Sequence, residues 1–168
     1  MNKEIYLAGG CFWGVQAYFD KIKGILSSET CYINGGYENV NYKEVCNNSG
    51  HVEAVKIIYD DSIISEKEIW ELFLRIIDPF SLNKQGNDIG AQYRVGVYAY
   101  DEKLLNIFKE FNKEFEKTSQ KSNYLEFEIV KDFTKAEEYH QKYLAKNPNG
   151  YCHINLTNIP DKYLKIKK

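Results

Sequence analysis

The 168-residue chain has no hydrophobic run long enough to cross a membrane, and no apolar segment near its start long enough for a secretory signal. Its net charge of −2 gives no electrostatic basis for binding nucleic acid or an anionic membrane. No internal repeat, low-complexity tract or linker divides the sequence. We therefore expect a single cytoplasmic domain over residues 1–168, with a loosely ordered tail at 161–168, and a monomer is the default expectation.

The four cysteines, Cys11, Cys31, Cys46 and Cys152, lack the paired C-x₂-C spacing of a zinc site. Structural disulfides are uncommon in the cytoplasm, so thiols in that compartment are more often free or redox-active. We therefore expect no metal site, and redox chemistry is the favoured function for this set of thiols.

Apolar spacing predicts an α/β (α+β) protein in which helices pack on a mostly antiparallel mixed sheet, the two-layer ferredoxin-like plait. The segments 37–50 and 78–92 are predicted as polar loops, and the second is long enough to suggest a functional role. Strands are predicted at 5–8, 25–33, 51–59, 93–100 and 125–130, and helices at 12–22, 66–76, 101–115 and, as a short helix capped near Thr134, at 134–144.

Cys11 follows the first predicted strand and the pair Gly9-Gly10, and helical spacing begins directly after it. The free N–H groups and the positive dipole end of a helix N-terminus favour a thiolate, which is the nucleophilic form of cysteine. The aromatic residues Phe12 and Trp13 suggest an apolar pocket beside the thiol. The alternative is a buried cysteine that packs as a small hydrophobic residue.

Glu53 lies near the start of the predicted strand 51–59. A carboxyl group facing the core at this position would be protonated at neutral pH, because burial disfavours the anion. The residues taken alone favour the other possibility, a strand glutamate that faces solvent.

The segment Gly10-Cys11-Phe12-Trp13-Gly14 resembles the active-site motif of the A-type peptide methionine sulfoxide reductases. The resemblance extends from Leu7 to Cys152, and the other matching segments are 41–46, 50–55, 78–79, 85–94, 139–144 and 147–152. It implies an α/β plait without a cofactor that reduces methionine S-sulfoxide, free or in peptides and proteins, to methionine. Such an enzyme repairs proteins after oxidation.

The resemblance implies a nucleophile, an acid and a resolving thiol. Cys11 would attack the sulfoxide sulfur and become a sulfenic acid, and Cys152 would condense with it to a disulfide that thioredoxin or another dithiol reduces. Glu53 would be a buried acid that protonates the sulfoxide oxygen. Because that oxygen leaves poorly unless protonated, we expect a Glu53 pKa raised by burial beside a Cys11 pKa lowered by the helix end.

Five further site residues follow from the same resemblance. Tyr42 and Tyr93 would bind the sulfoxide oxygen through hydroxyl groups that do not titrate near neutral pH. Asp88 would help to organise the pocket, and Phe12 and Trp13 would hold the methyl group of the substrate.

The remaining cysteines and histidines leave alternatives open. We expect Cys31, where many family members carry glycine, to be a buried bystander, and Cys46 to be structural. His51 or His140 could instead activate Cys11 in a hydrolase. A thiol peroxidase, and a ferredoxin-like binding module with an incidental cysteine, are the other two alternatives.

Overall fold

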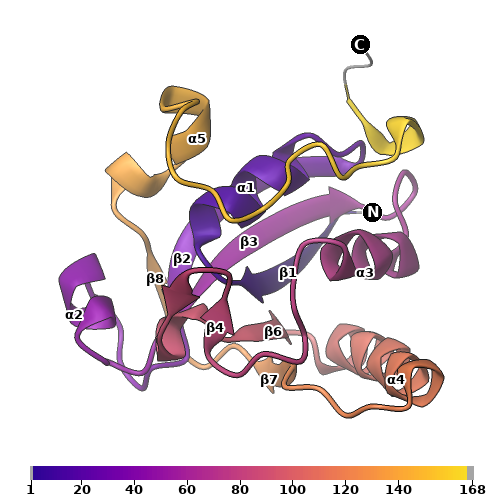
Figure 1. The fold of residues 1–168 in the computed structure, drawn as a ribbon, viewed down its shortest axis with the longest axis horizontal. Coiled ribbons are helices and arrows are strands. Elements are labelled where there is room, and N and C mark those ends of the chain that lie inside the picture. Colours follow the sequence, from indigo (N-terminus) through magenta and orange to yellow (C-terminus); the bar gives the residue numbers. More distant parts are fainter. Residues whose placement is uncertain (1, 166–168) are drawn as a thin grey trace.

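Six β-strands form one curled, mixed sheet at the centre of the computed structural model, which describes residues 2–165 (Figure 1). Their order is β7-β6-β1-β3-β2-β8, and all neighbours are antiparallel except β6 and β7. The predicted mixed α+β architecture is confirmed. The strands span Asn2–Gly9 (β1), Ile25–Ile33 (β2), Val52–Asp60 (β3), Val95–Ala99 (β6), Glu126–Ile129 (β7) and Phe133–Lys135 (β8).

Helices and one small hairpin complete the described part of the chain. The α-helices span Phe12–Asp20 (α1), Tyr42–Cys46 (α2), Glu66–Leu74 (α3), Glu102–Ser119 (α4) and Tyr143–Lys146 (α5). The 3₁₀-helices span Ala91–Tyr93 (η1), Glu138–His140 (η2) and Asp161–Tyr163 (η3), and the hairpin pairs Lys84–Gln85 (β4) with Asp88–Ile89 (β5).

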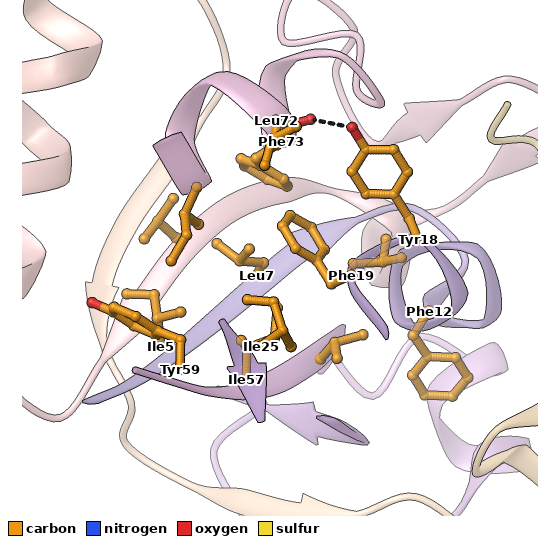
Figure 2. Close-up of a cluster of buried hydrophobic side chains, with 14 of the residues drawn as sticks. Ile5, Leu7, Phe12, Tyr18, Phe19, Ile25, Ile57, Tyr59, Leu72 and Phe73 are labelled. Atoms are coloured by element: carbon orange, nitrogen blue, oxygen red, sulfur yellow. Dashed lines mark hydrogen bonds between the residues drawn. The ribbon is translucent and has the colours of Figure 1, made fainter. Parts of the chain in front are cut away.

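The main hydrophobic core lies between the sheet and the helices α1 and α3 (Figure 2). Leu7 of β1 meets Phe19 of α1 and Phe73 of α3 in this core, and all three side chains are fully buried. The Tyr18 hydroxyl donates a hydrogen bond of 3.2 Å to the Leu72 carbonyl and so joins the two helices. Burial of this apolar surface is what holds α1 on the sheet.

A smaller cluster occupies the opposite face of the sheet. Successive side chains of a strand point to opposite faces, so Tyr6 and Ala8 of β1 belong to this cluster while Leu7 belongs to the main core. Cys31 is fully buried here, and its thiol donates to the Ala54 carbonyl at 3.4 Å. This environment agrees with the prediction of a buried bystander.

The two segments predicted as loops contain short regular elements, so this prediction was incomplete. Segment 37–50 includes α2, which begins where the Asn41 side chain accepts a hydrogen bond of 2.9 Å from the Glu44 N–H. Segment 78–92 includes the β4–β5 hairpin and η1. Elements of two to five residues are too short for a hydrophobic period to be visible.

The predicted helix at 134–144 is also wrong. Thr134 lies in β8 opposite Tyr32, and the segment that follows is divided into η2 and α5. Between these helices, the Gln141 side chain accepts from the Thr30 N–H at 2.9 Å and donates to the Thr30 carbonyl at 3.0 Å. These tertiary hydrogen bonds to β2 interrupt the local helical preference.

Part of the predicted tail is held against the body of the protein. Residues Asp161–Tyr163 form η3, and the Lys165 N–H donates to the Lys21 carbonyl at 2.9 Å. Residues 161–165 of the predicted tail therefore contact the body of the protein, and residues 166–168 lie outside the described part. No described helix combines the length and the apolar character needed to span a bilayer.

Candidate active site

The turn between β1 and α1 carries Cys11 and requires glycine. β1 ends at Gly9, α1 begins at Phe12, and Gly10 between them has a φ of 89°, which only glycine adopts readily. A Cβ at Gly10 would also lie 2.7 Å from the Cβ of Gln85. The turn therefore packs closely against the β4–β5 hairpin and holds Cys11 at the N-cap of α1, as predicted.

The Cys11 thiol is almost closed to solvent, with 8% of the residue exposed. Burial raises the pKa of this thiol well above its usual range, and a negative charge on Glu53 adds to the shift. The Trp13 backbone N–H donates to the sulfur and lowers the pKa, but its effect is smaller. The expected thiolate is therefore wrong for this structure, because one N–H at a helix end does not offset the desolvation of an anion.

Glu53 is a buried acid on β3, with 1% of the residue exposed. Its Oε1 accepts the Phe12 N–H at 3.3 Å, and its Oε2 has no hydrogen-bond partner among the described residues. Burial raises the pKa of Glu53 to about 8, the Phe12 N–H opposes this shift, and the charge of Asp88 adds to it. The solvent-facing alternative is wrong, and the carboxyl group is mostly protonated at neutral pH.

Asp88, the first residue of β5, faces the same turn but has more donors around it. Its carboxylate accepts the Cys11 N–H and the Tyr151 hydroxyl, and its Oδ2 lies 3.4 Å from the Nδ1 of His153. Burial raises the pKa of Asp88, whereas His153, Tyr151 and the Cys11 N–H each lower it. Asp88 is thus better able than Glu53 to carry a negative charge.

Tyr42 and Tyr93 bring two hydroxyl groups to the site. Tyr42 begins α2 and Tyr93 ends η1, both are partly buried, and their hydroxyls are hydrogen-bonded to each other. Burial raises both pKa values, and the charge of Glu53 adds to each shift. Both hydroxyls therefore remain protonated hydrogen-bond donors at neutral pH. The Glu137 carboxylate fixes the start of α2 by accepting the Tyr42 N–H at 2.9 Å.

The two aromatic rings after Cys11 have different environments. Phe12 is 1% exposed, and its ring lies 5.1 Å from that of His140. Trp13 is partly exposed, stacks on Tyr143 at 3.7 Å, and donates its Nε1–H to the His140 Nδ1 at 2.9 Å. The indole is thus fixed by contacts at its face and at its nitrogen, and it is the more accessible of the two rings.

Cys152 lies in the segment that follows α5 and runs beside α1 (Figure 1). A Cβ at Gly14, in the first turn of α1, would lie 3.0 Å from the Cys152 sulfur. Gly14, three residues after Cys11, therefore leaves room for the Cys152 thiol. A negative charge on Cys152 raises the pKa of Cys11, and both residues are free thiols. The fold thus brings together two cysteines that are far apart in the sequence.

Cys46 does not fit the predicted structural role. It is exposed at the end of α2, one helical turn after Tyr42, and its thiol is hydrogen-bonded to the Tyr42 hydroxyl. An exposed side chain contributes little to packing, so the prediction of a structural cysteine is wrong at this position.

The two histidines that could have activated Cys11 form hydrogen bonds elsewhere. His51 is fully buried, with its Nδ1 2.8 Å from Ser49 Oγ and its Nε2 2.7 Å from the Tyr37 carbonyl. His140 accepts the Trp13 N–H, and its Nε2 has no hydrogen-bond partner in the described part of the chain. This arrangement does not support the nucleophile–base pair of a Cys–His hydrolase.

The apolar residues that share a face of β3 with Glu53 are a sequence signal for its burial. Val55 and Ile57 share its face of β3 and belong to the main core, whereas Lys56 points to the other face. The period of two therefore places Glu53 on the helix-covered side. His153 and Tyr151 were not predicted as site residues, because no local pattern shows that the segment after α5 returns to Asp88.

Within residues 2–165, no group of three or more His, Cys, Asp or Glu residues is arranged to hold a metal ion. The site combines the Cys11 thiol with the protonated carboxyl group of Glu53 and with the hydroxyls of two tyrosines, Tyr42 and Tyr93. Such a set can attack an electrophilic sulfur and donate protons to an oxygen bound to it.

Comparison with known proteins agrees with this chemistry. The family model for peptide methionine sulfoxide reductase matches residues 3–168. A peptide methionine sulfoxide reductase MsrA of Mycoplasmopsis pulmonis is 61% identical over 165 residues, covering 98% of this chain and 99% of the relative.

Solved structures of similar proteins have the same fold. The reduced form of Mxr1 from Saccharomyces cerevisiae superposes with a TM-score of 0.84 at 33% identity, covering 92% of this chain and 91% of that one. Methionine sulfoxide reductase A of Corynebacterium diphtheriae gives a TM-score of 0.76 at 26% identity, with coverage of 90% and 77%. The chain belongs to the peptide methionine sulfoxide reductase family, MsrA type.

Proposed function

We propose that this protein reduces methionine S-sulfoxide, free or in oxidised proteins, to methionine by thiol chemistry. The observation that carries the proposal is the buried Oε2 of Glu53, which has no hydrogen-bond partner within residues 2–165 and lies next to a buried Cys11 thiol. A thiol nucleophile beside a neutral acid is the pair that a sulfoxide requires, because its sulfur must be attacked while its oxygen is protonated.

In the first step, the Cys11 sulfur attacks the sulfoxide sulfur while Glu53 donates its proton to the oxygen. Because burial keeps Cys11 as a thiol, its own proton must also leave during the attack, and Glu53 can accept that proton as it releases the other. The bond between the two sulfurs and the S–O bond of the sulfoxide then break, the oxygen bonds to the Cys11 sulfur as a sulfenic acid, and methionine departs. The net reaction of thiol and sulfoxide gives sulfenic acid and sulfide, without a net change in protons.

We assign the tyrosine and aromatic side chains to substrate binding. The hydroxyls of Tyr42 and Tyr93 would donate to the sulfoxide oxygen as negative charge develops on it. Trp13, held by His140 and Tyr143, would contact the methyl group, and Phe12 would form the buried wall behind it.

The cycle closes with a disulfide. We propose that Cys152 condenses with the sulfenic acid of Cys11 and that thioredoxin or a similar dithiol reduces the bond by exchange. The position of Cys152 beside Gly14 supports this assignment. Asp88 would hold the Cys11 turn through the Cys11 N–H. Thiols supply both electrons, so the proposed cycle involves no prosthetic group, and its demand for reduced dithiols suits the cytoplasm.

We further propose that the chain is one catalytic domain built on a ferredoxin-like plait. The order β1-α1-β2-β3-α3-β6, with β6 beside β1 and β3 between β1 and β2, supports this interpretation. In it, β7 and β8 are additions at the two edges of the sheet.

A single turnover tests the function. The fully reduced protein is mixed with a peptide that contains methionine S-sulfoxide, no reductant is added, and cysteines are mapped by mass spectrometry. We expect one equivalent of methionine and a Cys11–Cys152 disulfide, and neither product from Cys11→Ser. Rapid consumption of hydrogen peroxide with an inert sulfoxide would instead show a thiol peroxidase and overturn the proposal.

A further inference from the structure

The imidazole of His153 is pressed against the turn that carries Cys11. Its side chain is 6% exposed, and a Cβ at Gly10 would lie 2.9 Å from its Nε2. Glycine at position 10 is therefore needed for the histidine as well as for the positive φ of the turn. This histidine directly follows Cys152 in the sequence. Its side chain nevertheless contacts the turn that carries Cys11, the proposed disulfide partner of Cys152.

The partners of the two ring nitrogens define the tautomer of His153. Nε2 lies 3.0 Å from the Gly9 carbonyl, which can only accept a hydrogen bond, so Nε2 carries a proton. Nδ1 lies at an ion-pair distance of 3.4 Å from Asp88 Oδ2, and neither of these atoms has a hydrogen-bond partner in the described part of the chain. A proton on either atom makes this contact attractive, and it fixes the ring from its second side.

Cys152 lies between two residues that contact the same carboxylate. Tyr151 donates its hydroxyl to Asp88 and His153 places Nδ1 beside it, while the Cys152 thiol points toward Gly14 and donates to the Ile154 carbonyl at 3.3 Å. Asp88 also accepts the Cys11 N–H. The backbones that carry the two thiols are therefore joined through one carboxylate and through the bond from His153 to Gly9.

We propose that His153 is a positioning residue for disulfide formation, holding the backbone of Cys152 against the Cys11 turn through the Gly9 carbonyl and Asp88. The inference rests on the proposed function and names a residue for its second step. In that step the Cys152 sulfur bonds to the Cys11 sulfur and the S–O bond of the sulfenic acid breaks. The thiol proton of Cys152 leaves with the hydroxide as water.

The geometry separates this role from sulfoxide reduction. The ring nitrogens of His153 face the Gly9 carbonyl and Asp88, whereas the Cys11 sulfur receives the Trp13 N–H, and Glu53 is bonded to Phe12. Loss of the imidazole therefore removes the hold on Cys152 and leaves the acid and the nucleophile in place. The sulfenic acid should then form normally and persist.

The test measures the two steps separately in His153→Phe, His153→Gln and His153→Asn. Each reduced variant is mixed with the methionine S-sulfoxide peptide without reductant and is quenched at successive times. Methionine is quantified by chromatography, and the sulfenic acid is trapped with dimedone and located by mass spectrometry. Asn149→Ala, an exposed residue in the turn before Cys152, is the matched control.

We expect His153→Phe to form one equivalent of methionine at the wild-type rate but to form the disulfide about tenfold more slowly or worse, with dimedone on Cys11. His153→Gln should restore disulfide formation, because its amide nitrogen can reach the position of Nε2 and donate to Gly9. His153→Asn, whose shorter amide mimics Nδ1, should remain slow. Asn149→Ala should behave as wild type.

Two results would overturn the inference while leaving the proposed function intact. One is disulfide formation at the wild-type rate in both His153→Phe and His153→Asn. The other is a parallel loss of methionine and disulfide in folded variants, which would make His153 a support of the whole site. A wild-type protein that forms no methionine would refute the proposed function itself.

Discussion

Glu53 and Asp88 are two carboxyl groups beside one thiol, and they differ in the donors that surround them. Glu53 is 1% exposed, accepts one backbone N–H and keeps one oxygen without a partner among the described residues. Asp88 has a side chain that is 14% exposed and is contacted by the Cys11 N–H, the Tyr151 hydroxyl and His153. Burial raises both pKa values, but only at Asp88 do several donors oppose it.

This difference divides two tasks between similar groups. A carboxyl group with an unused oxygen and a raised pKa can give a proton to a substrate. A carboxylate with several donors around it is better suited to hold backbone segments in place. The comparison therefore predicts that replacing Glu53 affects proton transfer to the substrate, whereas replacing Asp88 affects the position of the backbone around Cys11.

The largest effect is expected for Glu53→Gln. The amide keeps the size of the side chain but cannot deliver a proton, so methionine formation at pH 7 should fall by about 10²–10⁴-fold. Single-turnover methionine release measures the loss. The control is Glu29→Gln, a carboxylate on β2 that pairs with Lys135 at 3.6 Å, and it should retain full activity. A normal rate in Glu53→Gln would remove Glu53 from the role of acid.

The next effect is the pH dependence of the wild-type protein. Glu53 has a pKa of about 8 and must be protonated to act, so the rate of methionine formation should be level below that pH. Above it, the rate should fall by about tenfold per pH unit as the acid ionises. A rate that instead rises through pH 8 would mean that a thiolate formed beforehand is the nucleophile, rather than a thiol whose proton passes through Glu53.

Asp88→Asn should have a smaller effect. The amide oxygen can still accept the Cys11 N–H, but the hydrogen bonds lose their charge, so we expect kcat/KM to fall by about tenfold. The pH midpoint near 8 should move down, because the Asp88 charge contributes to the raised pKa of Glu53. Asp161→Asn, an exposed aspartate of η3, is the control. An unchanged midpoint would show that the two carboxyl groups act independently.

The comparison also shows what the sequence could and could not predict. The helix α3 with its capping box at Ser65, and the strand β2, follow from local residue patterns and were predicted correctly. The two-residue period of β3 also indicates that the side chain of Glu53 is buried. Local patterns succeed here because each side chain packs according to its own element.

The protonation state of Cys11 could not be predicted in this way. The expectation of a thiolate at Cys11 rested on the helix end alone. The turn is buried beneath the C-terminal segment, and this desolvation determines the direction of the pKa shift of Cys11. The His153 contacts to Gly9 and Asp88 join residues that are far apart in the chain. Such contacts depend on the complete fold, so no window of sequence contains them.

The last expected effect concerns stability rather than rate. The pKa of Glu53 is 4.5 when unperturbed and about 8 in the folded protein, so the folded state binds the proton more tightly between these values. Stability from this group is complete below pH 4.5 and is lost as pH rises toward 8, by at most about 1.4 kcal/mol per pH unit. Glu53→Gln should remove this slope, so the difference in unfolding free energy between variant and wild type should grow in favour of the variant from pH 5 to pH 8. Urea unfolding at several pH values measures it, with Glu29→Gln as the control that keeps the wild-type slope. A constant difference across this range would show that Glu53 ionises as readily in the folded protein as in the unfolded chain, and Glu53 would then have no advantage over Asp88 as the acid.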